Sequence, residues 1–245
     1  MSNTEKPQRL KVAFVAAAGL GKRMQPLTAT TPKPLIKVCG KSLIDYGLDA
    51  LAEAGAERAI VNVHYLADLV EGHVKSRQRP EIIISDERET LLETGGGTLK
   101  ALPHLNDEAF YYLNADSIWI EGVKPNFIHL AESWDEANMD GLLLLSDRQK
   151  AIGYEGMGDF NMDAKGLLTR QQGGLAAPYV YASAAIFHPR LFKDAPTGKF
   201  SLNVLFDRAI EGGRLYGTHM NGTWLHVGTP DIIEVAESAI KNAAG

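Results

Sequence analysis

A short stretch near the amino terminus combines glycines with fixed positive charge. Residues 17–24 read Ala-Ala-Gly-Leu-Gly-Lys-Arg-Met, so Gly19 and Gly21 lie directly before a Lys-Arg pair. Glycines allow backbone N–H groups to approach an anion, an arginine offers a planar fork to phosphate oxygens, and a lysine acts as a compact point charge. The chemistry that this stretch predicts is the binding of a polyphosphate.

Neither of the two common phosphate-loop motifs fits this stretch. A Walker loop requires Ser or Thr after its Gly-Lys pair, and a dinucleotide fingerprint requires a third small residue where Met24 stands. A P-loop NTPase and an NAD-dependent enzyme are therefore both disfavoured. Taken alone, the stretch could equally be a tight turn with solvated charges.

The pattern continues well beyond the glycines. Residues 19–35 read G-x-G-x-R-M-x-P-L-T-x-x-x-P-K-P-L, in which two prolines flank Lys33 and fix the local backbone. This long pattern closely resembles the signature of the sugar nucleotidyltransferase family. Members of that family join a nucleoside triphosphate to a sugar-1-phosphate and release pyrophosphate.

The resemblance implies a role for each residue of the loop. Arg23 and Lys33 would be catalytic, with Lys33 contacting the α-phosphate and the sugar phosphate. A sugar-1-phosphate is already largely dianionic near neutral pH, because the second pKa of a phosphate monoester is about 6, so no general base is needed. The implied nucleotide-binding residues of the loop are Ala17, Ala18, Gly19, Gly21, Lys22 and Arg23, of which the two alanines would offer backbone groups to the nucleoside.

Three consecutive glycines form a second unusual feature. Residues 91–98 read Leu-Leu-Glu-Thr-Gly-Gly-Gly-Thr and precede a short helix expected over 99–102. Such glycines indicate either close approach of a flat ligand or simple looseness. The segment resembles one branch of the family, the bacterial N-acetylmuramate α-1-phosphate uridylyltransferases of peptidoglycan recycling. The resemblance implies that Gly95 and Gly96 pack against uracil, that UTP is the nucleotide, and that N-acetylmuramate α-1-phosphate is the acceptor.

A metal site is expected beyond the strand at 110–113. Asn114 and Asp116 follow this strand, and by the resemblance Asp116 binds Mg²⁺ while Asn114 contacts both nucleotide and sugar. The family's W-x-D-x-G-T motif reads here Trp-Leu-His-Val-Gly-Thr, so His226 replaces the second aspartate. Either His226 ligates the ion, with Mn²⁺ as the alternative metal, or Asp116 holds the ion alone. A hydrogen-bonded structural histidine is the third possibility.

The sugar side carries one further candidate. Asp159 lies in a Gly-Met-Gly-Asp-Phe segment that resembles the uridylyltransferase branch, where it would accept hydrogen bonds from the sugar. A turn that leads into the next strand explains Asp159 equally well.

The elements that position these residues follow a recognisable alternation. Strands at 11–18, 58–63 and 81–85 alternate with helices from 42 to 55 and from 66 to 77. This βαβαβ order predicts a parallel sheet with a ligand site at the carboxyl ends of its strands. The fold class is therefore α/β, a Rossmann-like fold of the GT-A type, with a mixed but mostly parallel sheet and a small antiparallel sugar-binding part. Further strands are expected at 141–145, 159–162, 167–171 and 179–187, a hairpin joins 214–220 to 223–227 across Asn221-Gly222, and a helix closes the chain at 230–243.

Composition bounds the remaining possibilities. The 245 residues fit a polar tail at 1–10 and a single domain at 11–245, with a nucleotide-binding part at about 11–120 and a sugar-binding part at about 121–230. A net charge of −5 argues against a nucleic-acid partner. The single cysteine, Cys39, and the lack of a signal peptide or of an apolar run of about 20 residues predict a cytoplasmic protein without a membrane span.

Other functions stay open at this point. Within the family, a guanylyl- or other nucleotidyltransferase that acts on mannose-1-phosphate or another sugar-1-phosphate is the first alternative. A non-catalytic homologue that senses nucleotides is the second, which His226 favours and the presence of Arg23, Lys33 and Asp116 disfavours. A retaining glycosyltransferase would need a D-x-D metal motif, and Asp116 lacks the second aspartate. The sequence leaves the oligomeric state open.

Overall fold

A large mixed β-sheet forms the centre of the protein in the computed structural model, which describes residues 10–171 and 173–243. The expected tail at 1–10 therefore lies, apart from its last residue, outside the described residues. The strands are β1 (Val12–Ala16), β2 (Lys37–Val38), β3 (Lys41–Ser42), β4 (Arg58–Val63), β5 (Glu81–Asp86), β6 (Phe110–Asn114), β7 (Ile118–Glu121), β8 (Gly141–Asp147), β9 (Phe160–Met162), β10 (Leu168–Arg170), β11 (Tyr179–Phe187), β12 (Leu215–His219) and β13 (Gly222–Leu225). The α-helices are α1 (Leu43–Glu53), α2 (Ala67–Val74), α3 (Glu93–Leu105), α4 (Asn126–Ser133), α5 (Asn203–Glu211) and α6 (Ile232–Ala243).

The sheet divides into a parallel and an antiparallel half. Its order is β10-β9-β11-β6-β1-β4-β5, with β8 added beside β11 and β12 beside β8. Strands β5, β4, β1 and β6 run parallel, whereas β11 pairs antiparallel with β6, β8 and β9. This arrangement confirms the expected α/β fold, in which a parallel half continues into a mixed second half.

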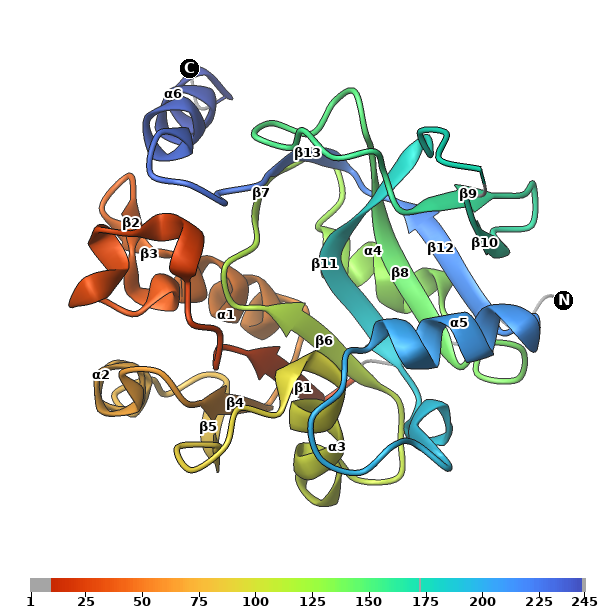
Figure 1. Cartoon of the computed structure of the whole chain (residues 1–245), viewed down its shortest axis with the longest axis horizontal. Coiled ribbons are helices and arrows are strands. Elements are labelled where there is room, and N and C mark those ends of the chain that lie inside the picture. The colour runs from red at the N-terminus through yellow and green to blue at the C-terminus, as the bar shows by residue number, and fades with distance from the viewer. Residues whose placement is uncertain (1–9, 172, 244–245) are drawn as a thin grey trace, which may run out of the picture.

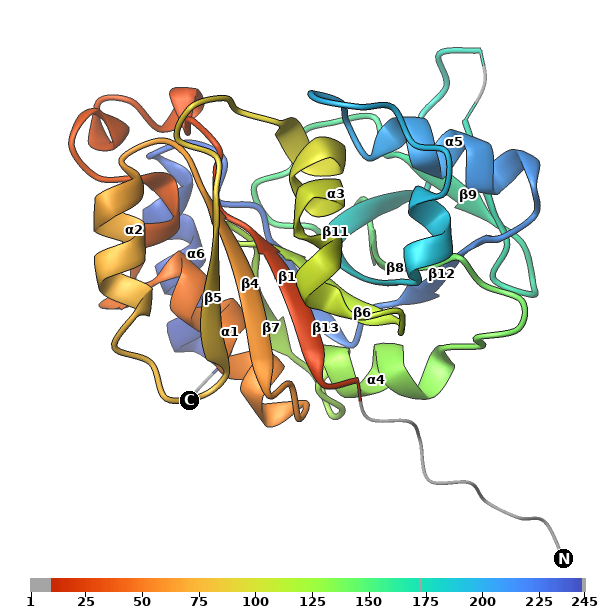
Figure 2. The same cartoon turned by 90° about the horizontal axis from the view of Figure 1, so that it is seen from below.

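Both faces of the central strands are covered by helices, which explains their unbroken apolar runs. In β1, Ala13 and Val15 pack into the core under α1, α2 and α4, while Val12 and Phe14 pack into the core under α3 and α5. Figures 1 and 2 show α1 and α3 on opposite sides of β1. Because β5, β4, β1 and β6 are parallel, their carboxyl ends lie at the same edge of the sheet. No helix among the described residues has both the length and the apolar character needed to cross a bilayer.

The hairpin expected across Asn221-Gly222 is wrong. Strand β12 pairs parallel with β8 in the large sheet, and β13 pairs antiparallel with β7 in a separate sheet of two strands. The side chain of Asn126 at the start of α4 binds the backbone of Asn221, accepting its N–H at 2.7 Å and donating to its carbonyl oxygen at 2.9 Å. This tertiary contact directs the chain from one sheet to the other, so Asn221-Gly222 forms a crossing rather than a hairpin turn.

The glycine triplet lies inside a helix rather than before one. Helix α3 begins at Glu93, six residues earlier than expected, because Gly95, Gly96 and Gly97 are all helical. A Cβ atom on Gly95 would lie 2.3 Å from the Phe200 ring, and one on Gly96 would lie 2.1 Å from the carbonyl oxygen of Gly198. The backbone N–H groups of Gly95 and Gly96 donate to the carbonyl oxygen of Phe200. These glycines therefore allow the segment 198–200 to lie directly on α3.

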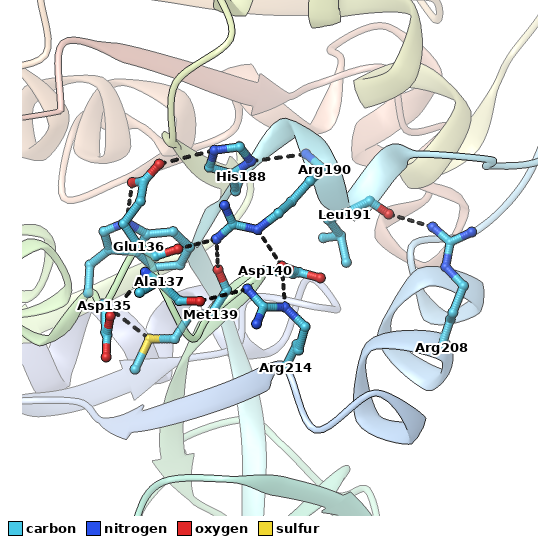
Figure 3. A network of polar contacts seen from close by, with 11 residues as sticks. Asp135, Glu136, Ala137, Met139, Asp140, His188, Arg190, Leu191, Arg208 and Arg214 are labelled. Carbon is cyan, nitrogen blue, oxygen red and sulfur yellow. Dashed lines mark hydrogen bonds and ion pairs between the residues drawn. The ribbon is translucent and has the colours of Figure 1, made fainter.

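The opposite end of the sheet is held by a network of arginines (Figure 3). Asp140 accepts hydrogen bonds from the Nε atoms of both Arg190 and Arg214, and Arg190 also donates to the carbonyl oxygen of Met139. The backbone N–H of Arg190 donates to Nδ1 of His188. The network fixes the turn before β8 against the start of β12 and the 3-10 turn that follows β11. It lies at the end of the sheet opposite the carboxyl ends of β1 and β4.

The packing of α3 makes a direct prediction about stability. We expect Gly96→Ala to lower the free energy of unfolding by about 1–3 kcal/mol, because the new methyl group would overlap the carbonyl of Gly198. Gly72→Ala in α2 is the matched control, since a Cβ there meets nothing within 4 Å, and it should raise stability by roughly 0.5–1 kcal/mol. Urea unfolding of both variants measures the difference. Equal effects at the two positions would contradict the close packing described here.

Candidate active site

A cavity of about 510 Å³ opens at the carboxyl ends of β1, β4 and β6. This volume falls within the range of about 300–1,000 Å³ that is typical of small-molecule sites. Nine of the residues singled out from the sequence line it, namely Ala17, Ala18, Gly19, Gly21, Lys22, Arg23, Lys33, Asn114 and Asp116. The structure thus brings together the amino-terminal loop and the residues after β6, as the parallel sheet predicted.

The amino-terminal loop is anchored by Met24, an apolar residue that carries no reactive group. Gly21 adopts a φ of +61°, which favours glycine, and starts the 3-10 turn Lys22–Met24. Met24 is fully buried and packs into a small core that includes Leu225 and Val227. Because Met24 points into that core, the preceding Lys22 and Arg23 stay exposed at the cavity. The residue that rules out a dinucleotide fingerprint is therefore the one that orients the cations.

Lys33 and Asp116 form an ion pair across the cavity wall. The Nζ atom of Lys33 lies 2.6 Å from Oδ2 of Asp116, and the two side chains are 10% and 36% exposed. Burial alone would raise the pKa of Asp116, but the charge and hydrogen bond of Lys33 lower it below its ordinary value. Asp116 is therefore ionised at neutral pH and is available to a cation.

His226 lies beside this pair. A Cβ atom placed on Gly228 would be 2.9 Å from Nε2 of His226 and 3.5 Å from Nη1 of Arg23. Burial lowers the pKa of His226, the positive charge of Lys33 lowers it further, and the negative charge of Asp116 opposes the shift. His226 is therefore neutral at physiological pH. Among its charged neighbours, Lys33 and Arg23 disfavour its protonation and Asp116 favours it.

The side chains at this edge fit a divalent ion that arrives with phosphate. Within residues 10–171 and 173–243, no group of three or more His, Cys, Asp or Glu side chains could hold a metal. Mg²⁺ commonly takes one or two protein carboxylates and completes its shell with substrate phosphates and water. Asp116, which already accepts a cation at 2.6 Å, satisfies this requirement in the absence of a preformed cage.

Three residues that were expected to contact the nucleobase or the sugar do not line the cavity, and those contacts stay predictions. Gly95 and Gly96 are buried under the segment 198–200 and do not line it; Glu93 and Thr94, one turn earlier, line it instead. Asp159 also lies outside the cavity lining, and its carboxylate accepts the backbone N–H of Tyr181 at 2.9 Å. Burial raises the pKa of Asp159. The carboxylate thus links the residue before β9 to β11.

Asn62 lines the cavity and was missed by the sequence analysis. Its Oδ1 atom accepts the backbone N–H groups of Ala17 at 2.6 Å and Ala18 at 3.3 Å. These two N–H groups are thus occupied, and the expected contact of the alanine backbone with a nucleoside stays a prediction. The signal was an asparagine within the apolar strand β4, because a buried amide must find partners. Tyr112 similarly donates its hydroxyl to Oδ1 of Asn114 at 2.9 Å, which fixes the orientation of that cavity residue.

Comparison with known proteins gives a consistent result. Residues 12–160 match the family model described as nucleotidyl transferase. The chain is 43% identical to an N-acetylmuramate alpha-1-phosphate uridylyltransferase of Caulobacter vibrioides, over 96% of this chain and 99% of that protein. It is 30% identical to the enzyme of the same name from Neisseria meningitidis serogroup B, over 89% and 93% of the two chains. A UDP-glucose pyrophosphorylase solved with UDP-glucose superimposes with a TM-score of 0.77 at 17% identity, covering 95% of this chain and 99% of that one.

The environment of His226 makes a testable prediction about pH. Its pKa should lie below the ordinary value of about 6.5, and Lys33→Met should raise it, because one of the cations that oppose protonation is removed. His226 binds a proton more readily in the unfolded chain than in the folded protein. The stability that the neutral histidine contributes to the folded protein is therefore complete above pH 6.5 and is lost as the pH falls toward the pKa of the folded state. A titration of the ring signals by NMR in the presence of EDTA, with His226→Gln for assignment, measures both values. A wild-type pKa at or above 6.5 would contradict the described burial.

Proposed function

Because this chain belongs to the nucleotidyl transferase family, we propose that it transfers UMP from UTP to N-acetylmuramate α-1-phosphate and releases pyrophosphate. The relatives from Caulobacter vibrioides and Neisseria meningitidis support this choice of nucleotide and sugar, since both carry that name and span nearly the same length. The observation that carries the reaction class is the cavity that places Lys33 and Asp116 beside an exposed Lys-Arg pair.

The proposed reaction is an in-line displacement at the α-phosphorus. A phosphate oxygen of the sugar-1-phosphate forms a new bond to that phosphorus, and the bond from phosphorus to the oxygen that bridges to the β-phosphate breaks. Pyrophosphate leaves with that electron pair. Because the acceptor is already an anion, the protein has no proton to remove; its tasks are to align two anions and to stabilise the charge that develops on the leaving group.

The cavity residues divide these tasks between them. Lys22 and Arg23, with the backbone around Gly19 and Gly21, bind the β- and γ-phosphates that become pyrophosphate. Lys33, held by the pair of prolines and by its carboxylate partner, contacts the α-phosphate and the incoming sugar phosphate. Asn114 lies between the two substrates at the end of β6. Lys22 and Arg23 thus stabilise the leaving group, and Lys33 stabilises the two phosphates that react.

We include a divalent ion in the proposal, with Mg²⁺ as the first choice and Mn²⁺ as the alternative. Asp116 would hold it together with the phosphates, and the ion would supply positive charge between the two reacting groups. The presence of an imidazole, His226, where the family motif has a second aspartate leaves this site with less negative charge. The low pKa of Asp116 and its position on the cavity wall support the assignment.

The proposal also places the protein in peptidoglycan recycling in the cytoplasm. N-acetylmuramate is a bacterial cell-wall sugar, and UTP is a cytoplasmic metabolite. Both bacterial relatives carry the name of an enzyme that acts on this sugar, which supports the assignment.

A panel assay for pyrophosphate release tests the proposal. Purified protein is incubated with N-acetylmuramate α-1-phosphate or mannose-1-phosphate, with UTP, GTP, CTP or dTTP, and with Mg²⁺ or Mn²⁺. We expect the fastest release from UTP and N-acetylmuramate α-1-phosphate. Faster release from GTP and mannose-1-phosphate would replace the proposed substrates with those of a guanylyltransferase. Nucleotide binding without release under any condition would favour the non-catalytic homologue.

Lys33 provides the sharpest test of the assigned roles. Lys33→Ala should lower kcat by at least about 10²-fold, in the range observed when a major electrostatic group is removed from an active site. Lys37→Ala, at an exposed position of β2 outside the cavity lining, is the control and should leave kcat unchanged. An unchanged rate for Lys33→Ala would remove Lys33 from the mechanism.

A further inference from the structure

Two buried polar side chains lie at the part of the cavity that is remote from Lys22, Arg23 and Lys33, and they have no role in the chemistry above. Asn62 near the end of β4 is 2% exposed, and Glu87, the residue after β5, is 1% exposed. Burying an amide beside a carboxylate is unfavourable unless every polar atom finds a partner. Such a pair therefore requires an explanation.

The pair forms a continuous chain of hydrogen bonds between two distant segments. Oδ1 of Asn62 accepts the N–H of Ala17 at 2.6 Å and that of Ala18 at 3.3 Å, and Nδ2 of Asn62 donates to Oε1 of Glu87 at 2.7 Å. Oε2 of Glu87 then accepts the N–H of Leu92 at 3.0 Å. We call this chain the Asn62–Glu87 relay; it connects the end of β1 to the start of α3.

The third glycine of the triplet gives the relay its space. A Cβ atom on Gly97 would lie 2.6 Å from Oε1 of Glu87 and 2.8 Å from Nδ2 of Asn62. Both distances are far shorter than a real Cβ contact, so no larger residue fits at this position of α3 while the relay keeps its geometry. The sequence of α3 is thus adapted to the relay.

Both ends of the relay lie on the cavity wall. Ala17 and Ala18 line one side, while Leu91 and Thr94, on either side of Leu92, line the other. Among the described residues that line this part, Glu93 carries a charge, which is paired with Lys199 at 3.3 Å, whereas the cations of the lining are Lys22, Arg23 and Lys33 of the amino-terminal loop. The nucleoside, the part of a nucleotide that carries no phosphate, matches this part of the cavity, which is lined by no cation among the described residues.

We propose that Asn62 and Glu87 are positioning residues that fix the distance between the two walls of the nucleoside-binding part of the cavity. This inference rests on the proposed function, because it assumes that the ligand is a nucleoside triphosphate. In this proposal the relay acts through the backbone that it binds, although Asn62 itself also lines the cavity. It holds the backbone of Ala17 and Ala18 at a set distance from the start of α3, so that the nucleoside enters a site that is already formed.

Exchanging the two functional groups of the relay tests this inference. Asn62→Asp alone places two carboxylates side by side with no donor between them. Glu87→Gln alone leaves only one acceptor oxygen for two donors, Nδ2 of Asn62 and the N–H of Leu92. In the double variant, the new carboxylate at position 62 accepts from Ala17, from Ala18 and from the new amide at position 87, and the oxygen of that amide accepts from Leu92. The double variant therefore restores every hydrogen bond of the relay. Only the bond between positions 62 and 87 has its donor and acceptor exchanged.

The expected readout is a change in KM for UTP that is separate from stability. Each single variant should raise KM for UTP by about 10- to 100-fold, the range expected when a buried group loses its partner, and should leave KM for the sugar phosphate unchanged. The double variant should return KM for UTP to within about threefold of the wild type. A purely structural role would lower Tm in the single variants and leave KM for UTP unchanged, since the folded fraction would bind as the wild type does.

The chain offers a matched control. Asn126 is fully buried and donates to Oε2 of Glu121 in a similar amide–carboxylate pair outside the cavity lining. Asn126→Asp should lower Tm and leave KM for UTP unchanged. If it raises KM for UTP as much as Asn62→Asp does, the effect is not specific to the relay and the inference is overturned.

A further variant keeps the inference testable if a relay variant does not fold. Gly97→Ala pushes on Asn62 and Glu87 without changing either residue, and it should also raise KM for UTP. Unchanged KM for UTP in either folded single variant of the relay or in folded Gly97→Ala overturns the inference, as does a double variant that binds UTP no better than the single variants. UTP binding is also measured by calorimetry without sugar phosphate. If the wild type prefers another nucleotide, the proposed substrate fails while the same variants, assayed with that nucleotide, still decide the role of the relay.

Discussion

The contact between Lys33 and Asp116 is the interaction on which the arrangement of the site depends. A protein that joins two phosphates needs cations for the phosphates and a carboxylate for a metal ion, all within a few ångströms of one another. Burying such charges singly would be costly, and pairing them offsets that cost in the absence of substrate. The 2.6 Å ion pair therefore keeps a lysine with 10% exposure and an aspartate ready at the same point of the cavity.

The pair can form only because the fold brings two loops to one edge. Asp116 follows β6, Lys33 belongs to the loop after β1, and these two strands are parallel neighbours in the sheet. Met24 holds the intervening loop by packing against Leu225 and Val227, which flank His226. The small core around Met24 thus connects the anion-binding loop to the carboxyl-terminal part of the site. Position, more than any unusual side chain, gives this cavity its electrostatic character.

The features that could be predicted from the sequence are those encoded locally. Apolar strands that alternate with amphipathic helices define the parallel sheet, and the loop from Gly19 to Lys33 carries its own pattern of glycine, charge and proline. The features that were wrong or missed depend on contacts between distant residues. Asn221-Gly222 has the local preference of a hairpin turn, but the amide of Asn126 redirects it. Asn62 appears as one polar residue in an apolar strand, and its importance becomes visible only with its partners across the sheet.

The glycine triplet shows how one motif can combine several independent constraints. Gly95 makes room for the ring of Phe200, Gly96 for the carbonyl of Gly198, and Gly97 for the amide and carboxylate beneath the cavity. None of these neighbours is a ligand, yet each belongs to a segment that adjoins the wall of the nucleoside-binding part: Ser201 follows Phe200 and lines the cavity, as do Leu91 and Thr94 beside the relay. The wall is therefore assembled from the end of β1, the start of α3 and the segment before α5. In the proposed function the nucleobase meets this composite wall, so the glycines can mark a branch of the family through the packing that shapes the wall.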